Sequence, residues 1–301
     1  MRRTRHAGVS TCVRADPQIC KNLVLGGTSV AILDPDVVTE EDLGANFFLR
    51  PQSCGKRRAE AVVEAVRELN PLVTVSVVHT AVGELSAAEL TKYTVVCCCD
   101  LPLPAQVALN DRCRAAGVAF FSACSLGLSA FLFCDLGAKH SFLVREATKE
   151  VNEEGDKVFQ YVPKELAFVT LREALGVPFA QAAAGSRERK RKAGGRSPAG
   201  FALELLAAIH VLGAAPAGRE QARAALRAVL QGAEGGPSED CVLELVEHAQ
   251  AGAELAPVCA VMGGIVGQEL IKCISGKDEP VNGFFFFDGL TGAGVVRTIK
   301  A

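Results

Sequence analysis

The sequence lacks the features that would place a protein in a functional class directly, such as a large net charge, a long apolar run or a secretory signal. Its 301 residues carry a formal net charge of only −2, so no overall charge draws the chain to nucleic acid or to an anionic membrane. No uninterrupted apolar run reaches the roughly 20 residues that span a bilayer. The basic start, with Arg2, Arg3 and Arg5, is not followed by the apolar core of a secretory signal. We therefore expect neither a nucleic-acid partner nor a membrane partner.

Metal-ligand and redox spacings are also missing, although the chain has 12 cysteines. No two of them show the C-x-x-C spacing of a zinc ribbon or a redox motif. Cys97, Cys98 and Cys99 close an apolar run, where thiols act as small hydrophobic side chains. A catalytic thiol needs an exposed, electropositive setting, and the sequence marks none. We therefore predict reduced, structural cysteines, no metal site and no catalytic residue in this chain.

What the chain does contain is an alternation of strand-like and helix-like segments. Short apolar runs are separated by amphipathic stretches with few connecting residues, which is typical of βαβ units. The pattern predicts an α/β fold built on a mostly parallel, Rossmann-like sheet. The expected strands are 29–33, 73–78, 94–99 and 118–123, and the expected helices are 55–69, 86–90 and 105–116.

The alternation stops near residue 145. Residues 146–157 are acidic and polar and predict a loop. The segments 201–212, 220–230 and 241–249 are rich in Ala and Leu and predict helices. The α/β body is therefore expected to carry a mostly helical insertion before the chain returns to it.

The sequence therefore divides into four expected parts. The insertion contains a basic loop. It is equally compatible with a nuclear localisation signal and with a solvated loop that no other protein recognises. The expected parts are a segment without the pattern at 1–18, a first half of the body at 19–145, the insertion at 146–250 with its basic loop 186–196, and a closing segment at 251–301.

The closing segment predicts a buried helix followed by a buried strand. Pro257 suits the first turn of a helix and Gly276 its end. Gly263, Gly264 and Gly267 lie inside this helix, where each costs roughly 1 kcal/mol relative to Ala. Three such glycines indicate that another element packs too closely for a side chain.

The strand is expected where four consecutive phenylalanines, Phe284 to Phe287, stand next to Asp288 and Gly289. An alternating strand would expose two of the four rings, so burial on both faces is expected. Residues 295–299 read as the returning strand of a hairpin.

Four blocks together carry a resemblance to one family: residues 32–50, residues 54–61, Leu69-Asn70-Pro71 and the stretch 256–289. They resemble the adenylation fold of the activating enzymes for ubiquitin-like proteins, which the bacterial ThiF and MoeB proteins share. The resemblance covers roughly residues 19–145 and 251–301, and the insertion matches loosely. Because Phe284–Gly289 lies close to the end of the chain, with no cysteine domain after it, the chain is most similar to the smaller subunits of SUMO-type activating enzymes.

The resemblance implies a function as the non-catalytic half of a heterodimer. In the family, the C-terminal glycine of the modifier attacks ATP and gives an acyl-adenylate and pyrophosphate, and a thiol of the larger subunit then takes the acyl group. ATP and Mg²⁺ are expected in the larger, cysteine-bearing subunit, with the ubiquitin-like modifier bound through the complex. None of these ligands is assigned to this chain itself, and a nuclear location, with the cytoplasm as a second compartment, is expected.

The family's nucleotide-site residues are partly preserved. Asp34 and Asp36 match an Asp-x-Asp pair of the family, whose first Asp holds the ribose hydroxyls, and Asp100 matches the position that helps to hold Mg²⁺. Arg58 stands where the family has a phosphate-binding lysine, which keeps the charge and changes the shape. The resemblance therefore implies a degenerate nucleotide site at these four positions.

Two further positions depart from the pattern. Active halves carry an asparagine and an arginine that contact the phosphates, and this sequence has Asp42 and Ala45 there. A carboxylate facing a triphosphate is repulsive, and alanine supplies no donor. Phe47, Phe48 and Leu49 match a segment near the family's subunit interface, so they are either docking residues or core residues.

The largest departure is at the start of the chain. The family's arginine-bearing first helix, its first strand and its Gly-x-Gly-x-x-Gly turn are not visible in Met1–Gln18. Ile19–Leu25 resembles the end of the helix that follows this turn. Loss of a central strand would leave buried backbone groups unpaired, at about 1–3 kcal/mol each. This favours the hypothesis of an N-terminally truncated or altered gene product.

Three alternatives stay open. A self-sufficient ThiF-like adenylating enzyme would exchange ATP and pyrophosphate alone, and the residues at Asp42 and Ala45 argue against it. A nicotinamide-dependent oxidoreductase is disfavoured because the glycine fingerprint is absent. A scaffold that docks a partner without any role in catalysis is compatible with the altered start.

Overall fold

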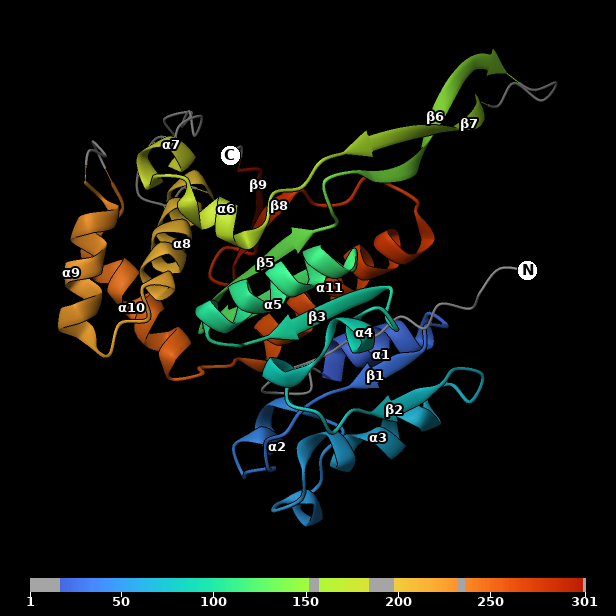
Figure 1. The fold of residues 1–301 in the computed structure, drawn as a ribbon, viewed down its shortest axis with the longest axis horizontal. Helices are drawn as coiled ribbons and strands as arrows, with labels where there is room; N and C mark the ends of the chain where they lie inside the picture. The colour runs from blue at the N-terminus through green and yellow to red at the C-terminus, as the bar shows by residue number, and fades with distance from the viewer. Residues whose placement is uncertain (1–16, 152–156, 184–197, 232–235, 300–301) are drawn as a thin grey trace.

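The computed structural model describes residues 17–151, 157–183, 198–231 and 236–299. It has an α/β body, a helical lobe on one side and a long β-hairpin that projects from the other side (Figure 1). The predicted α/β class is confirmed. Of the expected segment without the pattern, only Pro17 and Gln18 are among the described residues, as the first two residues of a helix.

Strands of the first half pair in parallel. β1 (Val30–Ile32) pairs with β2 (Val75–Val77), and β3 (Val95–Cys99) pairs with β4 (Ala119–Leu126). Helices connect each pair, as parallel strands require. The connecting elements are α2 (Asp42–Ala45) and α3 (Arg58–Glu68) for the first pair and α5 (Leu103–Ala116) for the second, with α4 (Ala87–Leu90) between β2 and β3. No described strand joins the β1–β2 pair to the sheet that holds β3.

The second half of the main sheet is antiparallel, which corrects the expectation of a mostly parallel sheet. β5 (Ser129–Asp135), β8 (Gly283–Asp288) and β9 (Ala293–Arg297) extend it in the order β3-β4-β5-β8-β9. β4 and β5 are joined directly at Gly127 and Leu128, and a connection this short reverses the chain. The α/β architecture is therefore built on a mixed sheet.

The phenylalanine strand is confirmed as a central strand. β8 lies between β5 and β9, and Phe284, Phe286 and Phe287 are buried. The two faces of the sheet belong to two separate apolar clusters. Phe284 and Phe286 pack with α5 and with helices of the insertion, whereas Phe287 packs with α1, α3 and α11.

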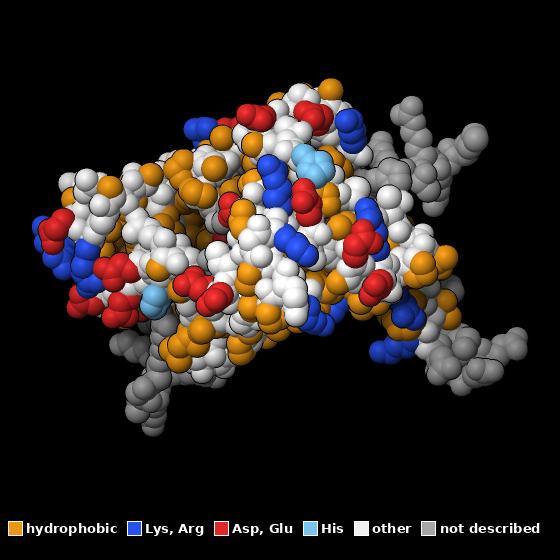
Figure 2. All heavy atoms as spheres, turned by 90° about the horizontal axis from the view of Figure 1, so that it is seen from below, with side chains coloured by type: hydrophobic (Ala, Val, Ile, Leu, Met, Phe, Trp, Pro, Cys, Tyr) orange, Lys and Arg blue, Asp and Glu red, His pale blue; other side chains and the backbone are white. Residues whose placement is uncertain are grey.

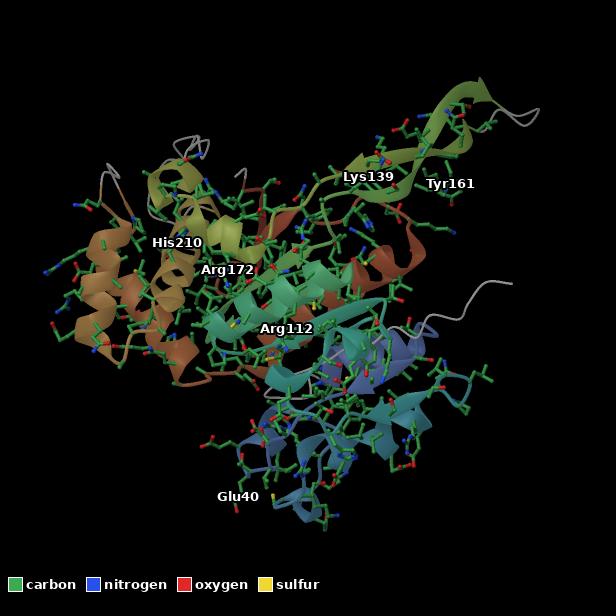
Figure 3. All side chains as sticks on the ribbon, viewed as in Figure 1. Glu40, Arg112, Lys139, Tyr161, Arg172 and His210 are labelled. Carbon is green, nitrogen blue, oxygen red and sulfur yellow. The ribbon has the colours of Figure 1, made fainter. Side chains whose placement is uncertain are left out.

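The insertion begins with a long hairpin rather than with a loop. β6 (His140–Val151) and β7 (Lys157–Leu166) pair antiparallel and extend away from the body, so the predicted loop at 146–157 is wrong for its described ends (Figure 3). Cross-strand contacts stabilise the ribbon: the Arg145 guanidinium lies 3.9 Å from the Phe159 ring, and Lys164 Nζ is 2.6 Å from a Glu146 carboxylate oxygen. The proposed boundary at residue 146 falls inside β6.

The rest of the insertion is helical, as expected. Its elements are α6 (Leu171–Gly176), α7 (Phe179–Ala183), α8 (Pro198–Gly213), α9 (Arg219–Val229) and α10 (Glu239–Gln250). The basic loop 186–196 lies outside the described residues.

On the face seen in Figure 2, basic and acidic side chains are interspersed rather than gathered by sign, in keeping with the small net charge.

Close packing of a neighbouring helix explains two of the three glycines in α11 (Ala256–Ser275). Helix α11 runs beside α1 (Pro17–Leu25), and a Cβ on Gly263 would lie 2.3 Å from the Gln18 Cβ. A Cβ on Gly267 would lie 3.1 Å from the Asn22 Cβ. Gly264 differs, because a Cβ there would meet nothing within 4 Å. The predicted close approach is confirmed for Gly263 and Gly267 and does not account for Gly264.

Among the described helices, α11 alone is long and apolar enough to cross a membrane by length and composition, with 39% of the tested window buried. In the sequence, only uninterrupted apolar residues were counted. Helix α11 is apolar enough on average even though it contains Gln268, Glu269 and Lys272. In this fold its buried side packs against α1 and the main sheet, and Glu269 accepts hydrogen bonds from Lys272 and the Val281 N–H.

Candidate functional site

Three of the four predicted nucleotide-site residues come together around one guanidinium. Asp34 follows β1, Asp36 lies two residues further on, and Arg58 is the first residue of α3. The Arg58 N–H donates to the Asp36 carbonyl at 2.8 Å, which brings the start of α3 against the end of β1. This backbone contact therefore places the Asp34 and Asp36 carboxylates next to the Arg58 side chain.

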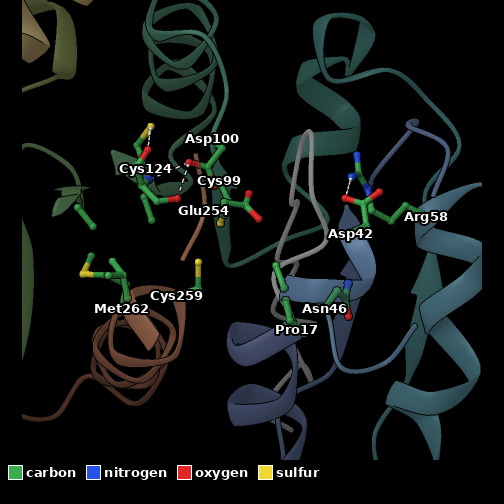
Figure 4. A pocket seen from close by; sticks show the side chains of 15 residues that line it. Pro17, Asp42, Asn46, Arg58, Cys99, Asp100, Cys124, Glu254, Cys259 and Met262 are labelled. Carbon is green, nitrogen blue, oxygen red and sulfur yellow. Dashed lines mark hydrogen bonds and ion pairs between the residues drawn. The ribbon is translucent and has the colours of Figure 1, made fainter. Parts of the chain in front are cut away.

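The Arg58 side chain is held by three carboxylates. Its Nε lies 2.9 Å from Asp34 Oδ2, one Nη lies 2.8 Å from Asp36 Oδ2, and the other lies 2.6 Å from Asp42 Oδ1. Arg58 is buried, and so are Asp34 and Asp42, while Asp36 is half exposed. Figure 4 shows the Asp42–Arg58 contact at one end of a cavity. We call Asp34, Asp36, Asp42 and Arg58 the arginine cluster.

The electrostatics of the arginine cluster are unfavourable to phosphate. Among the described residues, this one guanidinium contacts three carboxylates. Burial raises the pKa of Asp42, but hydrogen bonds from the Thr39 N–H and hydroxyl and the charge of Arg58 outweigh it and hold that pKa below its ordinary value. Asp42 therefore stays ionised at neutral pH, and its charge repels an incoming anion.

Asp100, the fourth predicted residue, lies apart from the arginine cluster. It follows β3 with a positive φ of 50°, and its Oδ1 accepts hydrogen bonds from the Ser125 N–H at 2.8 Å and from the Ser125 hydroxyl at 3.3 Å. Asp100, Asp42 and Arg58 line the same cavity, and Figure 4 shows Asp100 beside Cys99, Cys124 and Glu254, away from Asp42 and Arg58. The acidic residues Asp42, Asp100 and Glu254 thus line one cavity, and nucleotide binding there stays a prediction.

The remaining wall of this cavity combines thiols and apolar side chains with the polar residues Asn46, Ser125 and Glu254. Cys99, Cys124, Cys259 and Met262 line it. Burial, followed by the charge of Asp100, raises the pKa of the Cys124 thiol well above its ordinary value, which favours the protonated thiol over the reactive thiolate. Within the described residues no group of three or more His, Cys, Asp or Glu side chains is arranged to hold a metal ion.

The predicted docking segment is only partly exposed. Phe47 is 43% exposed, Phe48 is half-buried and Leu49 is buried. The Lys21 ammonium of α1 lies 5.6 Å from the Phe47 ring centre. Of the three, Phe47 is the side chain available to a partner, and Leu49 belongs to the core.

Sequence reasoning missed that Asp42 completes the arginine cluster. Asp42 was considered only for its repulsion of phosphate, whereas in the fold it is one of the partners of Arg58. The sequence did contain a signal, since both positions differ from the family pattern and the residues that stand there, Asp42 and Arg58, have opposite charges. A guanidinium offers five donors and satisfies three carboxylates at once, which a lysine ammonium does less well.

Fold and cavity together define an adenylation-fold protein, and the family comparison agrees: the ThiF family pattern matches residues 18–301, so the chain belongs to the ThiF family. Among curated proteins the chain is similar to SUMO-activating enzyme subunit 1. Identity is 33% to the protein of Rattus norvegicus, with 94% of this chain and 84% of that protein aligned. Identity to the Homo sapiens protein is 33%, with 94% of this chain and 85% of that protein aligned. Identity to the Danio rerio protein is 29%.

Proposed function

We propose that this chain is the non-catalytic subunit of a heterodimeric activating enzyme for a ubiquitin-like modifier, with SUMO as the modifier. Membership of the ThiF family and similarity to SUMO-activating enzyme subunit 1 over 94% of the chain support the assignment. In this proposal the larger, cysteine-bearing subunit binds ATP and Mg²⁺, adenylates the modifier and takes it as a thioester. The present chain supports that site and does not adenylate alone.

The observation that carries the proposal is the engagement of Arg58. A nucleotide site needs cations directed at the phosphates. Here the guanidinium that replaces the family's lysine is paired with Asp34, Asp36 and Asp42. A triphosphate that used this guanidinium would have to displace buried ion pairs. The same geometry argues against the alternative of a self-sufficient adenylating enzyme.

The test is reconstitution with a SUMO-activating large subunit. The two chains are co-expressed, the complex is isolated by size exclusion, and formation of the SUMO thioester on the large subunit is followed with ATP. The proposal predicts a stable complex that forms the thioester, and no thioester or adenylate with this chain alone. If no complex forms, the subunit assignment fails. If a complex forms without thioester, the chain is a scaffold.

We also propose a nuclear location, based on the basic run Arg187–Lys192. A fluorescent fusion of the full chain is compared with a variant in which the four residues Arg189, Lys190, Arg191 and Lys192 are changed to Ala. The proposal predicts nuclear signal for the first and a cytoplasmic shift for the second. Equal distributions of the two fusions contradict a signal in this segment.

A further inference from the structure

A cavity lies between the helical lobe and the α/β body, on the side where β3 ends. Its volume is about 730 Å³, and on the face drawn in Figure 2 hydrophobic side chains line a hollow between lobe and body. The body contributes the end of β3, the start of α5 and parts of β4 and β5, and the lobe contributes the α8–α9 loop and the end of α10. Volumes of about 300–1,000 Å³ at a boundary between two structural units are typical of small-molecule sites. We call this space the lobe cavity.

The wall of the lobe cavity is apolar except at a few positions. Leu103 and Phe131 line it and are buried, so part of the wall is continuous with the hydrophobic core. Among the described side chains that line the cavity, Asp100 alone is charged, and Gln106 and Gln250 carry amides. Most of the other lining residues are leucine, proline, alanine or glycine. In a wall of this kind the apolar groups bind the body of a ligand, and the few polar groups fix its orientation.

The Asp100 carboxylate is held in a fixed orientation on this wall. Its Oδ1 accepts a hydrogen bond from the Ser125 N–H at 2.8 Å and another from the Ser125 hydroxyl at 3.3 Å. Both donors are neutral, so they orient the carboxylate without cancelling its charge. A ligand that reaches this part of the wall meets a carboxylate, which attracts a cation and repels an anion.

Two strained backbone positions also lie on this wall. Among the described residues other than glycine, three have a positive φ: Asp100 at 50°, Ala215 at 48° and Asp278 at 63°. Asp100 and Ala215 both line the lobe cavity. The short polar side chain of aspartate tolerates this backbone, but an alanine has it at a cost of about 1–2 kcal/mol, and Pro216 restricts Ala215 further. Strained positions gather at ligand sites, so they are an indication of binding that is independent of the volume.

We propose that the lobe cavity binds a small apolar amine, with the hydrocarbon part against Leu103 and Phe131 and the ammonium beside Asp100. The volume admits a molecule of drug size, and the described wall offers one carboxylate and no cationic side chain. An ammonium beside a carboxylate forms a charge-assisted hydrogen bond, which is stronger where apolar groups exclude water. The inference goes beyond the proposed function, because it concerns a ligand of this chain and not its role beside a larger subunit.

The experiment compares three probes that share one ring system. Naphthylmethylamine is a cation at neutral pH, naphthylmethanol is neutral and naphthylacetate is an anion. Each probe is titrated into the full-length chain by calorimetry, and the unfolding midpoint of every variant is measured beside its affinity.

Two substitutions act on the lobe cavity, and each has a matched control. Asp100→Asn removes the charge and keeps an oxygen for Ser125, and Ala251→Trp places a large ring at an exposed position of the wall. Asp278→Asn makes the first change at the other aspartate with a positive φ. Ala224→Trp makes the second change at an exposed position of α9 that does not line the cavity.

The unchanged chain is expected to bind the amine at least about tenfold more tightly than the carboxylate. Asp100→Asn should weaken the amine by about tenfold and leave the alcohol as it was, since only the amine uses the charge. Ala251→Trp should weaken both the amine and the alcohol, because its ring occupies the space. Both controls should bind all three probes as the unchanged chain does.

The inference is overturned if no probe binds, if the amine and the carboxylate bind alike, or if a control weakens binding as much as its cavity variant. If Ala251→Trp lowers the unfolding midpoint, the selective loss of the amine in Asp100→Asn decides the matter alone. Failure of the chain to bind a large subunit would remove the proposed function and leave these results as they stand.

Discussion

At the scale of single residues, the charges around Arg58 decide what the predicted nucleotide site can bind. A buried ion pair is weak support for stability as a whole, but removing one partner leaves the others buried and uncompensated. Arg58 is the shared partner of Asp34, Asp36 and Asp42, so its loss would affect all three carboxylates. The arginine cluster therefore holds the end of β1, helix α2 and the start of α3 together.

Replacing Arg58 with Met tests whether the cluster stabilises the fold. The change leaves a shorter, unbranched apolar side chain and removes the charge and its N–H donors, so we expect the free energy of unfolding to fall by about 3–5 kcal/mol. The neighbouring Arg57 is exposed, and Arg57→Met is the matched control, with an expected change within about 0.5 kcal/mol. Urea denaturation measures both. Equal effects of the two substitutions would show that the ion pairs around Arg58 do not stabilise the fold.

The pH dependence of stability gives a second residue-scale prediction. The pKa of Asp42 is lowered in the folded chain, so its ionised form contributes stability above the ordinary carboxyl pKa of about 3.9. That contribution is lost as the pH falls through the folded-state pKa. We expect Asp42→Asn to be less stable than the unchanged chain at neutral pH, and the difference to shrink below about pH 4. A difference that is constant with pH contradicts a role for the ionised form.

At the scale of secondary-structure elements, sequence periodicity succeeded where burial is one-sided. The amphipathic pattern located α3, and the phenylalanine run located β8. The β6–β7 hairpin was missed because it projects from the body, and most side chains of β7 are exposed. A ribbon of this kind leaves no alternating apolar pattern to read. The antiparallel half of the sheet was missed because strand direction depends on turn length, which periodicity does not measure.

The structure brings three of the four predicted site residues together, and nucleotide binding by them stays a prediction. Asp34, Asp36 and Arg58 were identified by their place in the family pattern, and the fold brings them together. Their pairing with one another was not predictable from order along the chain, since Asp34 and Arg58 are 24 residues apart and meet only because α3 begins against the end of β1.

The glycines of α11 provide an element-scale prediction with an internal control. Gly263→Ala places a methyl group 2.3 Å from the Gln18 Cβ, so we expect the chain to be destabilised by about 1–3 kcal/mol through overpacking. Gly264→Ala meets open space and should stabilise the isolated chain by up to about 1 kcal/mol. Equilibrium denaturation of both variants is the measurement. Changes of the same sign would contradict the packing of α1 on α11.

At the scale of the whole molecule, the distribution of thiols follows the distribution of burial. Burial raises the pKa of both Cys113 and Cys273 to about 12, and Cys54 is the one described cysteine that is classed as exposed. This agrees with structural cysteines in a chain that leaves thiol chemistry to another subunit. The predicted absence of a catalytic thiol remains open to a direct test.

Alkylation of the native chain provides that test. With iodoacetamide at neutral pH, followed by peptide mapping, Cys54 should react first among the described cysteines, and Cys113 and Cys273 should react only after denaturation. Cys54→Ser should leave thioester formation by the reconstituted complex unchanged. A fast-reacting thiol among the buried cysteines, or loss of the thioester in Cys54→Ser, would contradict a purely structural role.

The division of labour between two chains is the central claim, and ATP–pyrophosphate exchange tests it most directly. Exchange is measured with SUMO and Mg²⁺ for this chain alone, for the large subunit alone and for the two together. The account predicts background exchange with this chain alone and SUMO-dependent exchange with the pair, because Arg58 is held by carboxylates and cannot serve a phosphate. SUMO-dependent exchange by this chain alone would contradict it.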